Sequence, residues 1–359
     1  MASYPSPTAI LSADQALALV DNGGHPEAVG VLSGRPILAV AVEDGPAGQR
    51  WADAARRLGC VAVGVAQRSM DTAPELDVLI CAEESPPRPW VSGNGPVESA
   101  LATLVEAVTA NPQASVALVQ LLRFGQDLGT HDALVAESFV YSTLQSGPEF
   151  ASWLSNREAP GPGPPRPPQD PRAGAVHTSL ADGVMTVHLW RPEVANALNV
   201  AMRDELVEAF DLAACDPSVR EVELKGQGAH FCSGGDLTEF GSGTDPATNH
   251  VVRTTRSPAR ALLACAERTT AFVHGNCIGA GIELPALCRT VQAAAGARFR
   301  LPEISMGLVP GSGGTVGIPR RIGPSRTAWM ALTGLEVDGA TALGWGLVDA
   351  LVPRANTES

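Results

Sequence analysis

Lysine is almost absent from this sequence, and aromatic residues are few. Lys225 is the only lysine, aromatics make up 4% of the chain, and 25 basic against 38 acidic side chains leave a formal net charge of -13. There is no run of lysine or arginine that could follow a nucleic-acid backbone. This composition argues against a nucleic-acid partner. A smaller anionic ligand would have to be held by arginine, backbone N–H groups or helix N-termini.

Cysteine pairs and long apolar runs are missing as well. The seven cysteines include no CxxC pair, which argues against a disulfide framework and against a zinc site, so no metal is expected. The chain does not open with a basic segment followed by an apolar one, and no stretch of 18 apolar residues lacks both charge and proline. We therefore expect a soluble protein of the reducing cytoplasm that does not contact membranes.

Proline is concentrated at one place and divides the chain. Residues 158–174 contain seven prolines, which can neither continue a helix nor donate a hydrogen bond within a sheet. We interpret this segment as a linker between two halves. A proline-rich ligand for another domain is the alternative interpretation. The 359 residues, 45% of them apolar, are enough to bury a core in both halves.

The half before the linker predicts two regions. Short apolar runs typical of buried strands occur in residues 1–96, at 37–42, 61–65 and 77–81. Residues 47–58 show a helical spacing of apolar and charged side chains. In residues 97–157 apolar side chains recur three and four positions apart, which predicts amphipathic helices. We expect a small α/β region followed by a helical region.

The half after the linker repeats a strand, a glycine turn and a helix. Residues 183–190 alternate like a strand, 202–216 have helical periodicity, and 221–226 form a second strand that leads toward the first glycine turn. Residues 271–275 form a further strand, which runs directly into the second turn. This order predicts an α/β fold.

The two glycine turns are the candidates for chemistry. They read HFCSGGDL (230–237) and HGNCIGAGIEL (274–284). Small residues let the backbone approach a ligand closely, and a helix N-terminus presents N–H groups that lack partners. Two such N–H groups that converge on one point would form an oxyanion hole. Tight turns that merely need a positive φ are the simpler alternative for each.

Five motifs together resemble the crotonase family, the enoyl-CoA hydratase/isomerase superfamily. In chain order they are RPEVANALN (191–199), the first glycine turn, the second glycine turn, FRLPEISMGLVPGSGGT (299–315) and ALGWGLVD (342–349). The resemblance covers about residues 175–355. It implies an α/β core built as a superhelix of ββα units, which acts on acyl-CoA thioesters.

The resemblance also implies roles for four residues. The backbone N–H groups of Gly235 and Ala280 would form the oxyanion hole that stabilises a thioester enolate. Alanine replaces the commoner glycine at 280, but the donor is main chain. Glu283 and Glu303 match the two catalytic carboxylates of the family's hydratases, where one takes a proton from water and the other helps to protonate Cα. Burial and mutual repulsion should raise the pKa of at least one of them.

The remaining implied residues would contact coenzyme A or the acyl group. Six residues are expected to contact coenzyme A. The loop after the first strand would contribute Glu193, Val194, Ala195 and Ala197, and the first glycine turn would contribute Ser233 and Leu237. Four are expected at the acyl end: Gly279, Pro302, Leu308 and Gly311. Members of the family often have a lysine just after the first turn, where this chain has Thr238. An arginine such as Arg191, Arg253 or Arg256 would therefore have to bind the phosphates of coenzyme A. Coenzyme A belongs to the substrate, and no separate cofactor is expected.

Members of the resembled family continue beyond the last motif with helices that cover the site and build a trimer. Residues 97–157 resemble those helices, which predicts that the cap precedes the core in this chain and that the protein is a homotrimer or a dimer of trimers. Residues 1–96 would then hold a degenerate copy of the core's opening strands. An unrelated α/β accessory domain is the alternative.

Three functions are open at this point. The leading one is the addition of water across a 2-enoyl-CoA double bond. An isomerase, or another enzyme of acyl-CoA enolate chemistry, would share the oxyanion hole and differ in its acid/base groups. A non-catalytic acyl-CoA-binding or scaffold protein is the alternative of another class.

Overall fold

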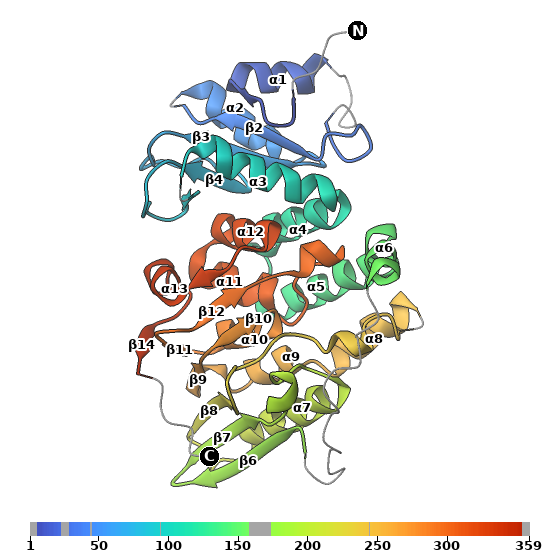
Figure 1. Ribbon diagram of the computed structural model, residues 1–359, viewed down its shortest axis with the longest axis vertical. Coiled ribbons are helices and arrows are strands. Elements are labelled where there is room, and N and C mark those ends of the chain that lie inside the picture. Colours follow the sequence, from blue (N-terminus) through green and yellow to red (C-terminus); the bar gives the residue numbers. More distant parts are fainter. Residues whose placement is uncertain are drawn as a thin grey trace.

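The computed structural model describes residues 6–22, 29–43, 45–93, 95–157, 174–243 and 245–353. The predicted linker, apart from Gly174, lies outside the described residues. Figure 1 shows an N-terminal sheet layer at one end, helices beneath it, and the larger C-terminal core at the other end.

The N-terminal sheet has five parallel strands in sequential order. They are β1 (Ile10–Leu11), β2 (Ile37–Ala41), β3 (Val61–Ala66), β4 (Val78–Cys81) and β5 (Val91–Ser92). The three runs that the sequence predicts as strands are confirmed as β2, β3 and β4. Successive residues point to opposite faces, and both faces are buried: Val61 and Val63 join one apolar cluster, Ala62 the other. Burial on both sides is why these strands are apolar without alternation.

Helices cover both faces of this sheet. On one face, α1 (Ala13–Asn22) and α2 (Pro46–Ala55) bury Leu17 and Trp51 against Leu38 and Leu79. On the other face lie α3 (Val97–Ala110) and α4 (Pro112–Gly125), whose apolar residues pack against alternate residues of β2 and β3. The helix predicted at 47–58 is therefore present as α2, and it ends at Ala55.

Two sheets build the C-terminal core. The six-stranded sheet has the order β14 (Ala350–Val352), β11 (Thr290–Ala294), β9 (Thr269–Val273), β8 (Glu221–Gly226), β7 (Val184–Leu189) and β6 (Val176–Ala181). Only its β6–β7 pair is antiparallel. The three-stranded sheet consists of β10 (Asn276–Ile278), β12 (Arg298–Arg300) and β13 (Val337–Asp338).

The core winds as a superhelix. After β9 the chain enters the smaller sheet as β10, and after β11 it enters as β12, so each turn adds one strand to each sheet. The helices between the strands are α7 (Val200–Cys215), α8 (Pro246–Thr255), α9 (Pro258–Leu263), α10 (Ala280–Glu283), α11 (Gly314–Ile322), α12 (Pro324–Thr333) and α13 (Gly339–Trp345). The predicted α/β class with a ββα superhelix core is confirmed.

The helical region joins the two layers. Beyond α3 and α4 it contains α5 (Thr130–Gln145) and α6 (Pro148–Asn156). Helix α12 packs against α3, α4 and β4, and its Ser325 Oγ accepts a hydrogen bond from the Leu79 amide at 3.0 Å. Helix α5 packs against α8 and α11. Residues 97–157 thus lie against the core, while their origin as a displaced cap stays a prediction.

One buried ion pair ties α4 to the N-terminal sheet. The Arg123 guanidinium donates to both carboxylate oxygens of Asp77, at 2.8 and 2.6 Å, and to the carbonyls of Leu58 and Cys60. Asp77 also accepts the Ala62 amide at 2.7 Å. Both charged side chains are largely buried, whereas the pair between Arg56 and Glu75 is exposed.

We expect Asp77→Asn to destabilise the protein by about 3–5 kcal/mol, because it leaves the buried Arg123 charge unpaired. Glu75→Gln breaks the exposed pair and should cost no more than about 1 kcal/mol. Urea unfolding followed by tryptophan fluorescence measures both, since Trp51 and Trp90 are buried in this layer. Equal effects of the two substitutions would contradict the assigned role of the buried pair.

Candidate active site

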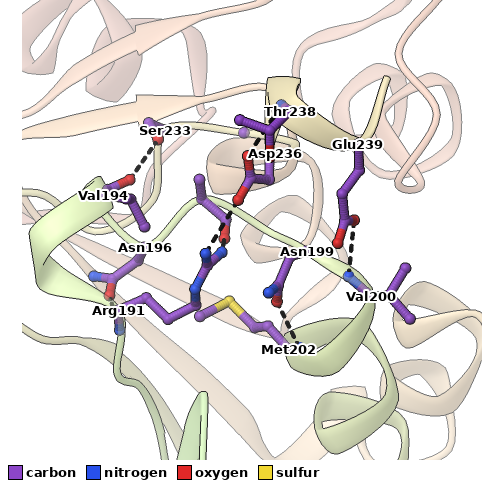
Figure 2. Close-up of polar contacts among 12 residues, drawn as sticks. Arg191, Val194, Asn196, Asn199, Val200, Met202, Ser233, Asp236, Thr238 and Glu239 are labelled. Atoms are coloured by element: carbon purple, nitrogen blue, oxygen red, sulfur yellow. Dashed lines mark hydrogen bonds and ion pairs between the residues drawn. The ribbon is translucent and has the colours of Figure 1, made fainter. Parts of the chain in front are cut away.

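The first glycine turn is paired with the loop that follows β7. The Leu198 amide donates a hydrogen bond to the Gly234 carbonyl at 2.8 Å, and the Asp236 amide donates one to the Leu198 carbonyl at 2.9 Å. The Ser233 amide donates to the carbonyl of Ala195 at 2.9 Å, and its hydroxyl reaches the Val194 carbonyl. Figure 2 shows these two segments side by side. The pairing fixes the backbone of the turn, including the N–H of Gly235.

Buried polar groups lock the same loop. Arg191 forms an ion pair with Asp236 at 3.1 Å, with both side chains nearly inaccessible (Figure 2). The Asn196 side chain is fully buried, and its amide donates to the carbonyls of Gln227, His230 and Phe231. The prediction that Arg191 could bind a coenzyme A phosphate is therefore wrong, because its guanidinium is buried and paired with Asp236.

The second glycine turn lies between β10 and α10. Gly279 has a φ of 52°, and a Cβ at this position would lie 2.6 Å from Oε1 of Glu303, so both conformation and space require glycine. Ala280 is the first residue of α10 and does not have a positive φ. Its Cβ is therefore compatible with the backbone, and alanine can replace the commoner glycine here.

The two turns meet. The Cys232 amide donates to the Asn276 carbonyl at 3.3 Å, and the Ile278 amide donates to the Cys232 carbonyl at 3.0 Å. Gly235 and Ala280 line the same cavity. Within the described part of the chain, neither of these two amides donates a hydrogen bond to another protein group. Two free N–H groups at one cavity are the arrangement that an oxyanion hole requires.

The cavity has a volume of about 170 Å³. Its walls come from the core and from α5, and they include the four predicted catalytic and oxyanion residues and Gly311. The complete lining is Tyr141, Leu198, Asn199, Val200, Arg203, Gly235, Glu239, Phe240, Arg253, Ala280, Glu283, Glu303, Gly311 and Ser312.

Glu283 is buried and held by backbone. Its Oε2 accepts hydrogen bonds from the amides of Ser312 at 2.6 Å and Gly314 at 3.0 Å. Burial, followed by repulsion from Glu303 and Glu137, raises the pKa of Glu283 well above its usual value. The carboxyl is thus fixed in direction and is easily protonated.

Glu303 begins the short 3₁₀ turn Glu303–Met306 and faces Glu283 across Gly279. Its Oε2 is buried and has no hydrogen-bond partner among the described groups. Burial, with a smaller contribution from the nearby Glu137, raises the pKa of Glu303 to about 8. A buried carboxyl oxygen without a protein partner is available to a water molecule or a substrate.

A third carboxylate lies beside the cavity, and sequence reasoning missed it. Glu137 of α5 is buried; it accepts the amides of Gly313 at 2.8 Å and Thr315 at 3.0 Å, and the Thr315 hydroxyl at 2.6 Å. Burial raises the pKa of Glu137. The only sequence signal was an acidic residue inside the apolar pattern of 130–145.

Tyr141 and Arg253 complete the wall on the side of α5. The Arg253 guanidinium stacks on the Tyr141 ring, 3.7 Å from its centroid, and donates to the Gly311 carbonyl. Burial raises the pKa of Tyr141 to about 12, so the phenol stays protonated. Arg253 and Gly311 also line a second cavity of about 330 Å³, which opens beside α5 and α8.

The residues expected to bind coenzyme A or the acyl group occupy several environments. Gly311 lines the cavity, whereas Leu237 is exposed in the turn Leu237–Glu239 and is not part of the lining. Leu308 is fully buried in the core. The carbonyls of Val194 and Ala195 accept hydrogen bonds from Ser233 of the first turn. The other expected residues are not part of the cavity lining: Glu193, Ala197, Gly279 and Pro302. Their roles stay predictions.

Among the described residues, no group of three or more histidine, cysteine, aspartate or glutamate side chains could hold a metal ion. In the same part of the chain, no helix is long and apolar enough to span a membrane.

Comparison with known proteins gives consistent matches. The sequence model of the family described as enoyl-CoA hydratase/isomerase matches residues 179–359. A 2,3-dehydroadipyl-CoA hydratase of Escherichia coli is 37% identical over 171 residues, which are 47% of this chain and 66% of that protein. An enzyme named a probable enoyl-CoA hydratase, from Rhodobacter capsulatus, is 36% identical over 186 residues, 51% of this chain and 70% of that protein.

Solved structures of similarly named proteins also match. A crystal structure of an enoyl-CoA hydratase from Mycobacterium smegmatis shows 34% identity, a TM-score of 0.47, and coverage of 50% of this chain and 71% of that chain. The chain thus spans about two thirds of the length of the curated relatives.

We expect the stability of the protein to fall as the pH rises from about 5 to about 8. The folded-state pKa of Glu303 lies above its unfolded value of 4.5, so the folded protein holds a proton that the unfolded chain releases. The stabilisation is complete below pH 4.5 and is lost as the pH passes the folded pKa, at up to about 1.4 kcal/mol per pH unit for one proton.

Glu303→Gln removes this titration and is the control. Thermal unfolding of both proteins across this pH range measures the effect. The wild type should lose stability relative to Glu303→Gln as the pH rises. Parallel profiles would show that Glu303 does not titrate as the structure indicates.

Proposed function

The chain belongs to the enoyl-CoA hydratase/isomerase family, and we propose that it adds water across the double bond of a 2-enoyl-CoA thioester. One observation carries the proposal: two backbone amides without partners and two buried carboxyls share one cavity. The amides suit the oxygen of a thioester, and the carboxyls suit the two proton transfers of hydration.

The oxyanion hole lowers the barrier to the addition. The thioester carbonyl oxygen would accept hydrogen bonds from the amides of Gly235 and Ala280. When the water oxygen bonds to Cβ, negative charge moves through Cα to this carbonyl oxygen. The two donors are already oriented, because hydrogen-bonded turns hold them, so they stabilise the enolate without reorganisation.

The two carboxyls divide the proton transfers. Repulsion and burial disfavour two negative charges at Glu283 and Glu303, and hydration requires the state in which the pair shares one proton. The ionised member takes a proton from the attacking water as the C–O bond forms at Cβ. The protonated member then delivers its proton to Cα as the enolate collapses. The pair ends with the same number of protons as it began with.

Isomerisation is the second candidate within the family. Moving a double bond needs one group that carries a proton between Cα and Cγ, and it needs no water. Glu303 provides a second carboxyl, whose buried Oε2 forms no hydrogen bond with a described protein group. A free acceptor of this kind could hold the water that hydration needs, which favours hydration. A non-catalytic acyl-CoA-binding protein would not need two buried carboxyls, which are costly to keep without a partner.

The acyl-CoA thioester is the substrate, no further cofactor takes part, and no nucleic acid or membrane is a partner. The seven cysteines are free, which favours the reducing cytoplasm. A homotrimer would cover the large exposed apolar side chains on α5 and α8, of which Phe139 and Val251 are each 57% exposed.

Ala280→Pro should lower kcat by about 10²–10³-fold, because proline removes one oxyanion donor. Proline is tolerated at the first position of a helix, so the fold should persist. Ala280→Gly keeps the N–H and should retain activity within a few fold. Loss of the 2-enoyl absorbance of crotonyl-CoA measures the rates. Equal activity in the two variants would remove the backbone of residue 280 from the mechanism.

Glu283→Gln and Glu303→Gln should each lower kcat by about 10²–10⁴-fold, because each removes one proton-transfer group. Each variant should still bind acetoacetyl-CoA, which ionises to an enolate and changes its ultraviolet absorbance. Turnover of a 3-enoyl-CoA that survives Glu303→Gln, without hydration of crotonyl-CoA by the wild type, would assign the chain to isomerisation. Binding of acyl-CoA without turnover of either ester would assign it to the non-catalytic class.

A further inference from the structure

The loop Gly311–Thr315 donates its amides alternately to two carboxylates. Ser312 and Gly314 donate to Glu283, while Gly313 and Thr315 donate to Glu137. Glu283 belongs to the core and Glu137 to α5, on the other side of the predicted linker. The loop is therefore held between one carboxylate from each half of the chain.

The position of this loop explains why two anions gather there. It runs into the N-terminus of α11, which begins at Gly314, and the first amides of a helix lack acceptors within the helix. The aligned peptide dipoles also favour negative charge at this end. Glu283 accepts two of these amides, those of Ser312 and Gly314. Without Glu137 the other two buried donors would have no acceptor, at a cost of about 1–3 kcal/mol each.

Glu137 has the contacts of a dedicated acceptor. Its two oxygens receive three hydrogen bonds, from the amides of Gly313 and Thr315 and from the Thr315 hydroxyl. It does not line the catalytic cavity, although its helix does so through Tyr141. Glu137 therefore acts on the reaction from outside this cavity: it keeps Ser312 and Gly314 where they fix Glu283, and its charge raises the pKa of Glu283 and Glu303.

We propose that Glu137 is a positioning residue, which sets the orientation of Glu283 through the Gly311–Thr315 loop and makes α5 a required part of the active site. The proposal rests on the hydratase function proposed above. It assigns to the region 97–157 a part in catalysis that a separate accessory domain would not have.

Glu137→Gln tests the proposal. The amide has nearly the shape of the carboxyl, but its NH₂ group cannot accept the second N–H. The loop should shift and misplace Glu283, and a displacement of about 1 Å costs about 10²-fold in kcat. KM should change little. The affinity for acetoacetyl-CoA should also persist, because the amides of Gly235 and Ala280 do not depend on Glu137.

Glu149→Gln is the matched control. Glu149 of α6 likewise accepts two backbone amides, those of Gln113 and Ala114, but it does so at the start of α4. This variant should lose similar stability and keep its kcat. A normal kcat in Glu137→Gln would overturn the proposal. So would a loss of acetoacetyl-CoA binding together with kcat, since that result means a general collapse of the site.

Thr315→Val is the second variant, and it decides the matter if Glu137→Gln does not fold. It removes the 2.6 Å hydroxyl bond to Glu137 and keeps the backbone amide. We expect a lower kcat with unchanged acetoacetyl-CoA binding, and recovery of kcat in Thr315→Ser, which restores a hydroxyl. An unchanged kcat in Thr315→Val would count against the role of Glu137.

Hydrogen exchange separates this proposal from the proposed function. In Glu137→Gln the amides of residues 312–315 should exchange faster, whereas in Glu149→Gln the faster exchange should appear at residues 113–115. This readout needs no turnover. A wild type without hydratase activity would refute the proposed function and leave the exchange result to decide the coupling. Unchanged exchange at the loop in Glu137→Gln would refute the coupling itself.

Discussion

Four backbone amides of one short loop connect the two halves of the chain at the cavity. The amides of Ser312 and Gly314 hold Glu283, and those of Gly313 and Thr315 hold Glu137. Each buried carboxylate would be costly without these donors, and each donor would be costly without its carboxylate. The orientation of the Glu283 carboxyl and the attachment of α5 therefore depend on the same hydrogen bonds.

The charges around the cavity follow from this arrangement. Three carboxyls lie close together, and burial raises the pKa of each, so the cavity resists becoming fully anionic. Arg253 is one of the nearby cations, and it lowers the pKa of Glu137, although burial outweighs it. The guanidinium is held by the Tyr141 ring and the Gly311 carbonyl. The positive and negative charges around the cavity therefore come from both halves of the chain, Glu137 from before the predicted linker and Arg253 from after it.

The sequence predicts the residues whose role depends on local pattern. Gly235, Ala280 and Glu283 lie in short motifs that resemble those of a known family, and this resemblance is what predicts that they share one site. Glu137 and Tyr141 could not be predicted in the same way, because their contacts span more than a hundred residues and α5 resembles any amphipathic helix. Arg191 shows the opposite error: its charge suggested a ligand, but only the structure shows that Asp236 neutralises it.

Distance along the chain does not make the contact of α5 weak. The entropy lost in closing a loop grows only with the logarithm of its length, so doubling the separation costs about 0.6 kcal/mol. A hydrogen bond to a charged group contributes about 1.5–3 kcal/mol, and Glu137 accepts three. A helix placed before the core can thus hold the loop as firmly as one placed after it. What the site requires is an acceptor at this end of α11, and the order of the segments in the chain is secondary.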